Sequence, residues 1–329
     1  MIELSGDRVR AVVSPLAAML VDAVFEVDGL EHRPLARAPW IGEPGLETHP
    51  GHLRVLGGDF VGLPFGASGA PARLDPAWAD LVPIEAPEPV HGPAAEFEWT
   101  VTEQTADSVT LALDYPLDSP IARVERTVSV RAGAAALDFR LVVAARATAA
   151  VSLALHPILR LPAHARDLHL VVPFTTGFTY PGRIDPGLGP TVPWREFDSL
   201  SAVPARQGEP VDFSRLPLPS PVQDNVMLTG VTGPLHAQFA DTGTRVTIDW
   251  DRELLPSLML WLSDGVIEEE PWNGRYRGLG VEPLAAAFDF ADSVSIAPNP
   301  LSARGVTTAI DLSPAAPVVL HHSIEVYAA

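Results

Sequence analysis

Arg245-Val246-Thr247-Ile248-Asp249-Trp250 alternates polar and apolar side chains without interruption. Because successive side chains of a β-strand point to opposite faces, this pattern predicts a strand with one face buried and the other toward solvent. No apolar stripe at helical spacing is sustained over three turns anywhere in the chain. Similar alternation recurs in 97–102, 109–113, 123–131, 137–143 and 235–239, and the apolar segments 225–229 and 258–262 are further candidate strands. The sequence therefore predicts an all-β fold of at least a dozen antiparallel strands in packed sheets, with few or no helices.

Length and composition favour one large domain. The chain has 329 residues, of which 47% are hydrophobic, and its 34 prolines and 25 glycines are spread throughout it. That distribution is typical of many turns between short strands, and all-β domains often exceed two hundred residues as one unit. We expect a single domain over residues 1–329, with a short helical turn over 284–290 and strands over 151–161 and 294–296.

The charge and the missing residue types exclude several functions. Arginine supplies all 22 basic residues against 41 acidic ones, a net charge of −19 that disfavours a nucleic-acid partner. The absence of lysine excludes Schiff-base chemistry and a P-loop, and the absence of cysteine excludes disulfides and thiolate metal sites. We expect no membrane span and no signal peptide, because there is no long apolar run and no basic leader. These features predict a cytoplasmic location.

One candidate site residue is Glu282. If 277–283 is a strand, Leu279 and Val281 face one side, and the two glycines of this segment face the other side together with Glu282. The missing side chains would leave a slot beside the carboxylate for a ligand. The alternative is a solvent-facing glutamate at a strand end.

Four further residues stand in informative settings. His156 interrupts an apolar segment, where a ring nitrogen needs a partner or a role, although a satisfied core histidine is the simpler alternative. His91 precedes a Gly-Pro turn, and Asp224 stands where a turn-rich stretch enters a strand, so each has a plain loop or turn-capping alternative. Trp272, in a Pro-Trp-Asn-Gly loop, suits stacking on a sugar but also ordinary packing. No zinc-binding histidine spacing is present.

The order and spacing of these landmarks resemble the aldose 1-epimerase (galactose mutarotase-like) family, over essentially the whole chain. The resemblance rests on a Gly-Gly-x-Phe…Pro-Phe-Gly loop at 57–66, Val-His-Gly at 90–92, the strand histidine 156, the aspartate 224 and Leu-Gly-Val-Glu-Pro at 279–283. Two features depart from the family pattern. Residues 64–68 lack the Asn-Arg pair that many mutarotases carry, and Pro157-Ile158 replaces a Tyr-Phe pair. These departures leave the identity of the sugar open.

The resemblance implies an antiparallel β-supersandwich with a sugar in a cleft at one face. It implies Glu282 as general base and His156 as general acid, with His91 and Asp224 holding sugar hydroxyls. Trp272 and Arg277 are the further substrate-binding candidates. Interconverting two anomers requires removing the C1 hydroxyl proton and protonating the ring oxygen. A glutamate and a histidine on opposite sides of the sugar can make both transfers, without a metal or another cofactor.

Three functions follow as hypotheses. The first is a mutarotase acting on a free hexose, with a small-molecule sugar as partner and a monomeric or homodimeric state. The second is an epimerase for a phosphorylated hexose, for which Arg183, Arg275 and Arg277 are the candidate phosphate ligands. The third is a non-catalytic carbohydrate-binding protein on the same scaffold, because a fold does not determine a function. The turn-rich segment 173–222 would cap one end of the sandwich or act as a lid.

Overall fold

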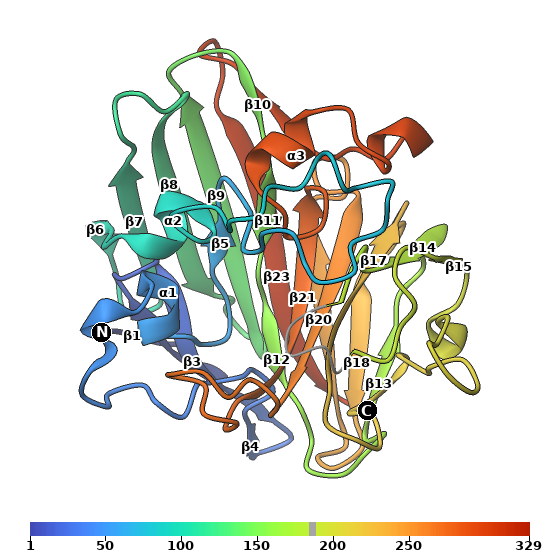
Figure 1. Cartoon of the computed structure of the whole chain (residues 1–329). Coiled ribbons are helices and arrows are strands. Elements are labelled where there is room, and N and C mark those ends of the chain that lie inside the picture. The colour runs from blue at the N-terminus through green and yellow to red at the C-terminus, as the bar shows by residue number, and fades with distance from the viewer. Residues whose placement is uncertain (184–188) are drawn as a thin grey trace.

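A computed structural model describes residues 1–183 and 189–329, so the part of the expected cap or lid at 184–188 lies outside the described residues. The regular structure is almost entirely β, and two large antiparallel sheets form its two main layers (Figure 1). In the order of their pairing, the nine-stranded sheet contains β16 (Arg215–Leu216), β13 (Leu168–Val171), β18 (Leu235–Phe239), β19 (Thr244–Trp250), β23 (Val318–Ala328), β9 (Ala136–Ala145), β8 (Ile121–Val130), β7 (Ser108–Asp114) and β6 (Thr100–Gln104). This architecture agrees with the predicted all-β supersandwich.

The second layer is an eight-stranded sheet. Its strands are β15 (Glu196–Phe197), β14 (Thr176–Thr179), β17 (Gln223–Thr229), β20 (Ser257–Asp264), β21 (Arg277–Ala285), β11 (Leu153–Leu155) and β5 (Val61–Gly62), with β12 (Ile158–Arg160) also pairing with β21. Two smaller sheets complete the β-structure: β1 (Ile2–Ser5), β2 (Val9–Ser14), β3 (Met19–Val27) and β4 (Leu30–His32), and the pair β10 (Ala149–Val151) with β22 (Ile310–Leu312). The α-helices of the described residues are α1 (Gly51–Arg54), α2 (Gly92–Glu96) and α3 (Asp292–Ile296).

The main core lies between the two large sheets. Val246 and Ile248 of β19 are fully buried in it, as the alternating pattern predicts, and Leu260 of β20 is fully buried there as well. Each such side chain stabilises the fold by about 1.5–3 kcal/mol through removal of apolar surface from water. The opposite face of the eight-stranded sheet packs against a second apolar cluster that includes Met259. In Figure 1 the cyan connection that follows β5 crosses in front of this face.

Two local expectations differ from the structure in the first half of the chain. The strand expected at 97–102 begins only at Thr100, after α2, and is exposed throughout, because β6 is an edge strand of its sheet. The continuous strand expected over 151–161 is divided into β10, β11 and β12, and the break between β11 and β12 falls at His156-Pro157. Proline has no N–H to donate to the ladder, which accounts for that break.

The elements expected near the C-terminus are displaced. Strand β21 continues as far as Ala285 and no helix forms over 284–290, where a helical turn was expected. The helix α3 forms instead where a short strand was expected at 294–296. Pro283 lies opposite Leu258 in the register of β20 and β21, so tertiary pairing overrides the local signal there. Among the described residues, no helix has both the length and the apolar character needed to cross a bilayer.

A buried ion-pair network joins the loop before Phe60 to the nine-stranded sheet. Asp59 Oδ2 accepts hydrogen bonds from Arg126 Nη2 and from His322 Nε2, the latter at 2.9 Å. The His322 ring stacks on Phe139 with centroids 4.2 Å apart, and all of these side chains are buried. Burial alone would raise the pKa of Asp59, but the charges of Arg126 and His322 outweigh it and hold that pKa below its usual range. The network therefore anchors the loop that precedes Phe60.

Candidate functional site

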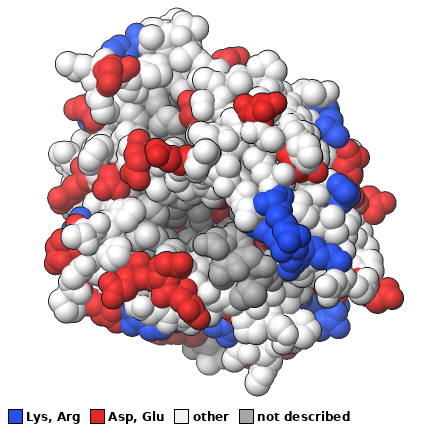
Figure 2. Space-filling view, in the orientation of Figure 1, with Lys and Arg blue, Asp and Glu red and all other residues white. Residues whose placement is uncertain are grey.

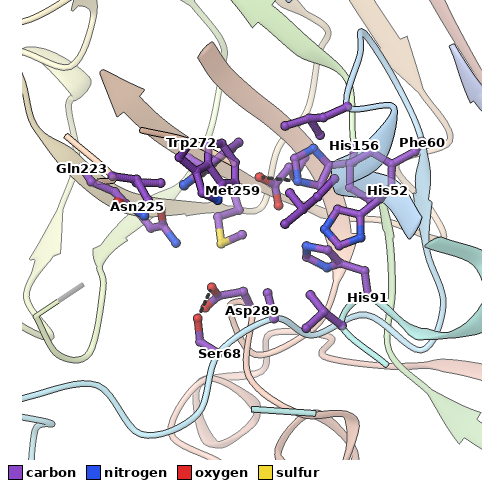
Figure 3. Close-up of a pocket in the computed structure, with 17 residues that line it drawn as sticks. His52, Phe60, Ser68, His91, His156, Gln223, Asn225, Met259, Trp272 and Asp289 are labelled. Carbon is purple, nitrogen blue, oxygen red and sulfur yellow. Dashed lines mark hydrogen bonds and ion pairs between the residues drawn. The ribbon is translucent and has the colours of Figure 1, made fainter. Parts of the chain in front are cut away.

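A pocket lies on the face of the eight-stranded sheet that is turned away from the nine-stranded sheet. It has a volume of about 210 Å³, and Figure 2 shows a hollow near the centre of this side of the molecule. Residues from distant parts of the chain converge on it (Figure 3). Its polar lining consists of His52, Ser68, His91, His156, Gln223, Asn225, Glu282 and Asp289. Four of the six residues expected from the sequence line this pocket: Glu282, His156, His91 and Trp272.

Glu282 and His156 face each other directly. Glu282 extends from β21 and is 1% exposed, while His156 stands at the break between β11 and β12. The His156 backbone N–H donates to the carbonyl of Phe60 at 2.9 Å, and the two rings stack with centroids 4.3 Å apart. These contacts place Nε2 of His156 3.3 Å from Oε1 of Glu282. The two side chains that the sequence predicts as the proton-transfer pair therefore lie side by side in the pocket.

Burial favours the uncharged forms of Glu282 and His156. Burial raises the pKa of Glu282 well above its usual range, and the nearby Asp289 carboxylate raises it further. Burial lowers the pKa of His156 to about 3, and the neighbouring His52 contributes to the lowering. Both effects favour a protonated carboxyl group beside a neutral imidazole. The pair then holds one proton that it can give, and one ring nitrogen that can accept another.

Two further histidines complete one wall. His91, in the left-handed conformation (φ 58°) at the start of α2, stacks on Phe65 with centroids 4.9 Å apart. His52 of α1 stacks on Phe60 at 5.4 Å and meets the His91 ring edge-on at 5.3 Å. Burial lowers the pKa of His91 well below its usual value and that of His52 to about 4, so both imidazoles are neutral near pH 7. His52 was not among the site residues expected from the sequence, and no local sequence signal distinguishes it.

The remaining lining combines aromatic surface with amides. Trp272 packs edge-on against Trp261 with ring centroids 5.9 Å apart, and both side chains line the pocket. Gln223 and Asn225 of β17 line the pocket on the side opposite the histidines (Figure 3). Their side-chain oxygens are buried and have no hydrogen-bond partner among the described residues. The pocket therefore offers flat apolar surface together with free hydrogen-bonding groups, the combination that suits a sugar.

Asp224 does not line the pocket, contrary to the expectation. It points to the other face of β17, the face that carries Val226 and Leu228 into the main core. There its carboxylate accepts hydrogen bonds from the backbone N–H and the hydroxyl of Thr191, at 3.0 and 2.8 Å. Burial raises its pKa to about 6. Asp224 thus anchors the chain at Thr191, and Gln223 and Asn225 on either side of it face the pocket instead.

The expected arginines also lie elsewhere. Arg277 donates to Asp264 at 2.5 Å and lines a different depression, and Arg275 pairs with Glu43 at 2.7 Å. Partial burial, together with the charges of Arg73 and Arg206, lowers the pKa of Arg183. None of these arginines is among the described residues that line the pocket. The part of the pocket that the structure describes therefore holds no cation for a phosphate group.

The slot expected beside Glu282 is filled by the protein itself. A Cβ atom on Gly278 would meet the Tyr276 hydroxyl at 2.8 Å, and one on Gly280 would overlap Glu282 Oε1 and stand 3.1 Å from Trp261 Cβ. Leu279 and Val281 face the main core, as predicted. The two glycines thus make room for neighbouring side chains rather than for a ligand.

Comparison with known proteins identifies the fold. No protein-family model and no curated protein sequence matches the chain. Among solved structures, a protein from Escherichia coli K12 proposed to be an aldose 1-epimerase superposes with a TM-score of 0.68 at 15% identity, over 99% of this chain and 98% of that chain. A galactose mutarotase-like protein from Lactobacillus casei gives 0.62 at 17% identity, over 99% and 100% of the two chains. A GalM/aldose epimerase homologue from C. elegans gives 0.61 at 14% identity, over 99% and 98%. The resemblance inferred from the sequence is confirmed at the level of the fold: the chain has the galactose mutarotase-like fold.

Proposed function

We propose that this protein is an aldose 1-epimerase that interconverts the α and β anomers of a free hexose. The observation that carries the proposal is the 3.3 Å approach of His156 Nε2 to Glu282 Oε1 inside a pocket of about 210 Å³. The C1 hydroxyl oxygen and the ring oxygen of an aldose are bonded to the same carbon. An acid and a base that lie side by side can therefore reach both oxygens at once.

The protons balance over one cycle. In ring opening, His156 Nε2 accepts the C1 hydroxyl proton while Glu282 donates its proton to the ring oxygen. The electron pair of the broken O–H bond forms the carbonyl, and the C1–ring oxygen bond breaks. After rotation about C1–C2, Glu282 removes the proton from the attacking hydroxyl and His156 returns a proton to the carbonyl oxygen. In ring opening these roles are the reverse of those that the family resemblance implies, and in the closing step each group takes the opposite role.

Three features support a neutral sugar as substrate. The fold neighbours include proteins whose names refer to mutarotases and aldose epimerases. Trp261, Trp272 and Phe60 supply aromatic surface in the pocket, and pyranose rings stack on such surfaces. The described lining also lacks an arginine, which counts against the phosphorylated hexose of the second hypothesis.

Polarimetry on freshly dissolved α-glucose and α-galactose tests the proposal. We expect the wild-type protein to accelerate equilibration, and Glu282→Gln and His156→Gln each to lower kcat by about 10²–10⁴-fold, because each removes one proton-transfer group. Glu325→Gln is the matched control, since Glu325 pairs with Arg131 on the nine-stranded sheet and does not line the pocket. No acceleration with either sugar, or an unchanged rate in Glu282→Gln, would overturn the proposal.

Two further measurements distinguish the alternative functions. Calorimetry that detects sugar binding by a wild-type protein without mutarotase activity would favour the non-catalytic carbohydrate-binding protein. Acceleration with a hexose 6-phosphate alone would favour the phosphorylated substrate.

A further inference from the structure

A second carboxylate of the pocket is held in a defined orientation. Asp289 lies on the connection between β21 and α3 and is 9% exposed. Ser68 Oγ donates to its Oδ2 at 2.7 Å, and the Tyr180 hydroxyl donates to its Oδ1 at 2.8 Å. The Asp289 carbonyl also accepts the backbone N–H groups of Ala67 and Ser68, at 2.7 and 2.9 Å. The carboxylate is thus anchored through both oxygens and through its own backbone.

These hydrogen bonds occupy only part of the acceptor positions of the Asp289 carboxylate. A carboxylate has about four acceptor positions, and one described donor is engaged at each oxygen of Asp289. Asp289 and Ser68 both line the pocket, and Figure 3 shows them together across the open space from His156. A sugar whose C1 lies at Glu282 and His156 would therefore present its remote carbons toward Asp289.

The charge of the lining determines what can bind at this end. The described residues that line the pocket include two carboxyl groups, Glu282 and Asp289, and no arginine, and the chain has no lysine. The three imidazoles are neutral near pH 7 because burial lowers their pKa values. A ligand group at Asp289 must therefore supply hydrogen-bond donors, while an anionic group there would face like charge without a compensating cation.

We propose that Asp289 is a specificity-determining residue that accepts hydrogen bonds from hydroxyl or amino groups on the sugar carbons remote from C1. Through this contact it selects neutral and amino sugars over sugar phosphates and uronic acids. Ser68 and Tyr180 act as positioning residues that orient its carboxylate. The proposal rests on the proposed function only for the placement of C1 at Glu282 and His156.

Binding rather than turnover provides the test. Trp261 and Trp272 line the pocket, so their fluorescence, with calorimetry as a second readout, reports ligand affinity in the full chain. The probes are glucose, galactose, their 4-deoxy and 6-deoxy forms, glucosamine, glucose 6-phosphate and glucuronic acid. We expect Asp289→Asn to weaken binding of the parent hexose by about 10- to 100-fold, the range for a hydrogen bond to a charged group. For the deoxy sugar that lacks the contacted hydroxyl, wild type and Asp289→Asn should bind equally.

Anionic sugars provide a second test of the proposal. Wild type should bind glucose 6-phosphate and glucuronic acid more weakly than glucose, and Asp289→Asn should narrow that difference because it removes the like charge. The side-chain amide introduced by Asp289→Asn retains hydrogen bonds to Ser68 and Tyr180, since each hydroxyl can donate or accept, so the fold should persist. Tyr180→Phe keeps the carboxylate but releases one oxygen, and it should reduce the selectivity for the contacted hydroxyl by a smaller factor.

Asp292→Asn is the matched control. Asp292 lies three residues further on and accepts from the Ser152 backbone N–H and hydroxyl, at 2.6 and 2.8 Å, and it does not line the pocket. Its sugar affinities should stay within about twofold of wild type, because its side chain contacts Ser152 and does not line the pocket.

The possible outcomes distinguish a failure of the Asp289 proposal from a failure of the proposed mutarotase function. Unchanged affinity of Asp289→Asn for every sugar, or no deoxy sugar for which the two proteins converge, overturns the role of Asp289 even if mutarotation is found. The expected binding pattern without mutarotation upholds Asp289 and overturns the enzyme. A wild-type protein that binds none of the probes overturns both.

Discussion

Gly280 and Glu282 lie on the same face of β21, and a Cβ atom on Gly280 would stand less than 3.0 Å from Oε1 of Glu282. Carbon and oxygen atoms that are not bonded do not approach so closely, so any larger residue at position 280 must displace the carboxylate or Trp261, whose Cβ lies 3.1 Å away. The glycine is needed for the space that it leaves beside the glutamate. This contact places the requirement for glycine next to the proposed proton-transfer pair.

Gly280→Ala should therefore impair catalysis more than folding. We expect kcat for mutarotation to fall by about 10²-fold, because a displacement of roughly 1 Å in a reacting group has an effect of that size. The free energy of unfolding should fall by about 1–3 kcal/mol, as for overpacking in a well-packed region. Gly6→Ala is the control, since its Cβ would meet Val130 Cγ1 at 2.6 Å, far from the pocket lining. A full rate in Gly280→Ala would show that catalysis does not require the space that this glycine leaves beside Glu282.

The pH dependence of the mutarotation rate should follow the shifted pKa values of Glu282 and His156. The active pair holds one proton, which is lost when pH rises through the raised pKa of Glu282, while a second proton is gained only near the His156 pKa of about 3. We expect kcat/KM to decline as pH rises through the raised Glu282 pKa, and not to decline as pH falls below that pKa toward 5. Polarimetry corrected for the buffer-catalysed reaction measures this profile. A rate that declines as pH falls through about 6.5, the value of an exposed histidine, would contradict the neutral resting pair.

Asp224→Asn should leave sugar binding within about twofold of wild type, because its side chain faces Thr191 and not the pocket. Its effect should appear in stability. The folded pKa of Asp224 is about 6, above the ordinary value of 3.8, so its contribution to stability is present at low pH and is lost as pH rises through 6. About two pKa units correspond to roughly 3 kcal/mol. Urea denaturation at pH 4 and at pH 7 measures this effect. The decrease in the free energy of unfolding between these two pH values should be larger for wild type than for the variant, by roughly 3 kcal/mol. A large loss of sugar affinity would instead place Asp224 in the site.

The Asp59–Arg126 pair should behave as a buried ion pair. Asp59→Ala leaves the Arg126 guanidinium buried without this partner and should lower the free energy of unfolding by about 3–5 kcal/mol. The double variant Asp59→Leu, Arg126→Met should recover much of that loss, because neither charge remains. Since the folded pKa of Asp59 is below its unfolded value, its contribution is present above pH 4 and is lost as pH falls further. Thermal denaturation of the single and double variants measures the recovery, and additive losses would contradict the pairing.

Part of the site could have been predicted more accurately from the sequence. Asp224 has the same parity as Val226 and Leu228 along its strand, so alternation alone indicates that it faces the core, and that Gln223 and Asn225 face the other way. The expectation for Asp224 followed the family resemblance instead of that local pattern. No such signal exists for Asp289, which reaches the pocket beyond the end of a long strand through contacts with Ser68, 221 positions away along the chain.

The sequence by itself determined the all-β class, the faces of strands such as β19 and the candidacy of Glu282, because each depends on the period of two within a single strand. It made His156 a candidate because a ring nitrogen interrupts an apolar segment. The meeting of His156 with Glu282, the presence of His52 and Asp289 in the same pocket, and the removal of Asp224 and Arg277 from it were decided only by the tertiary structure. Those outcomes depend on which strands pair, in what register and around which buried contacts, and such long-range choices leave no mark within any one segment.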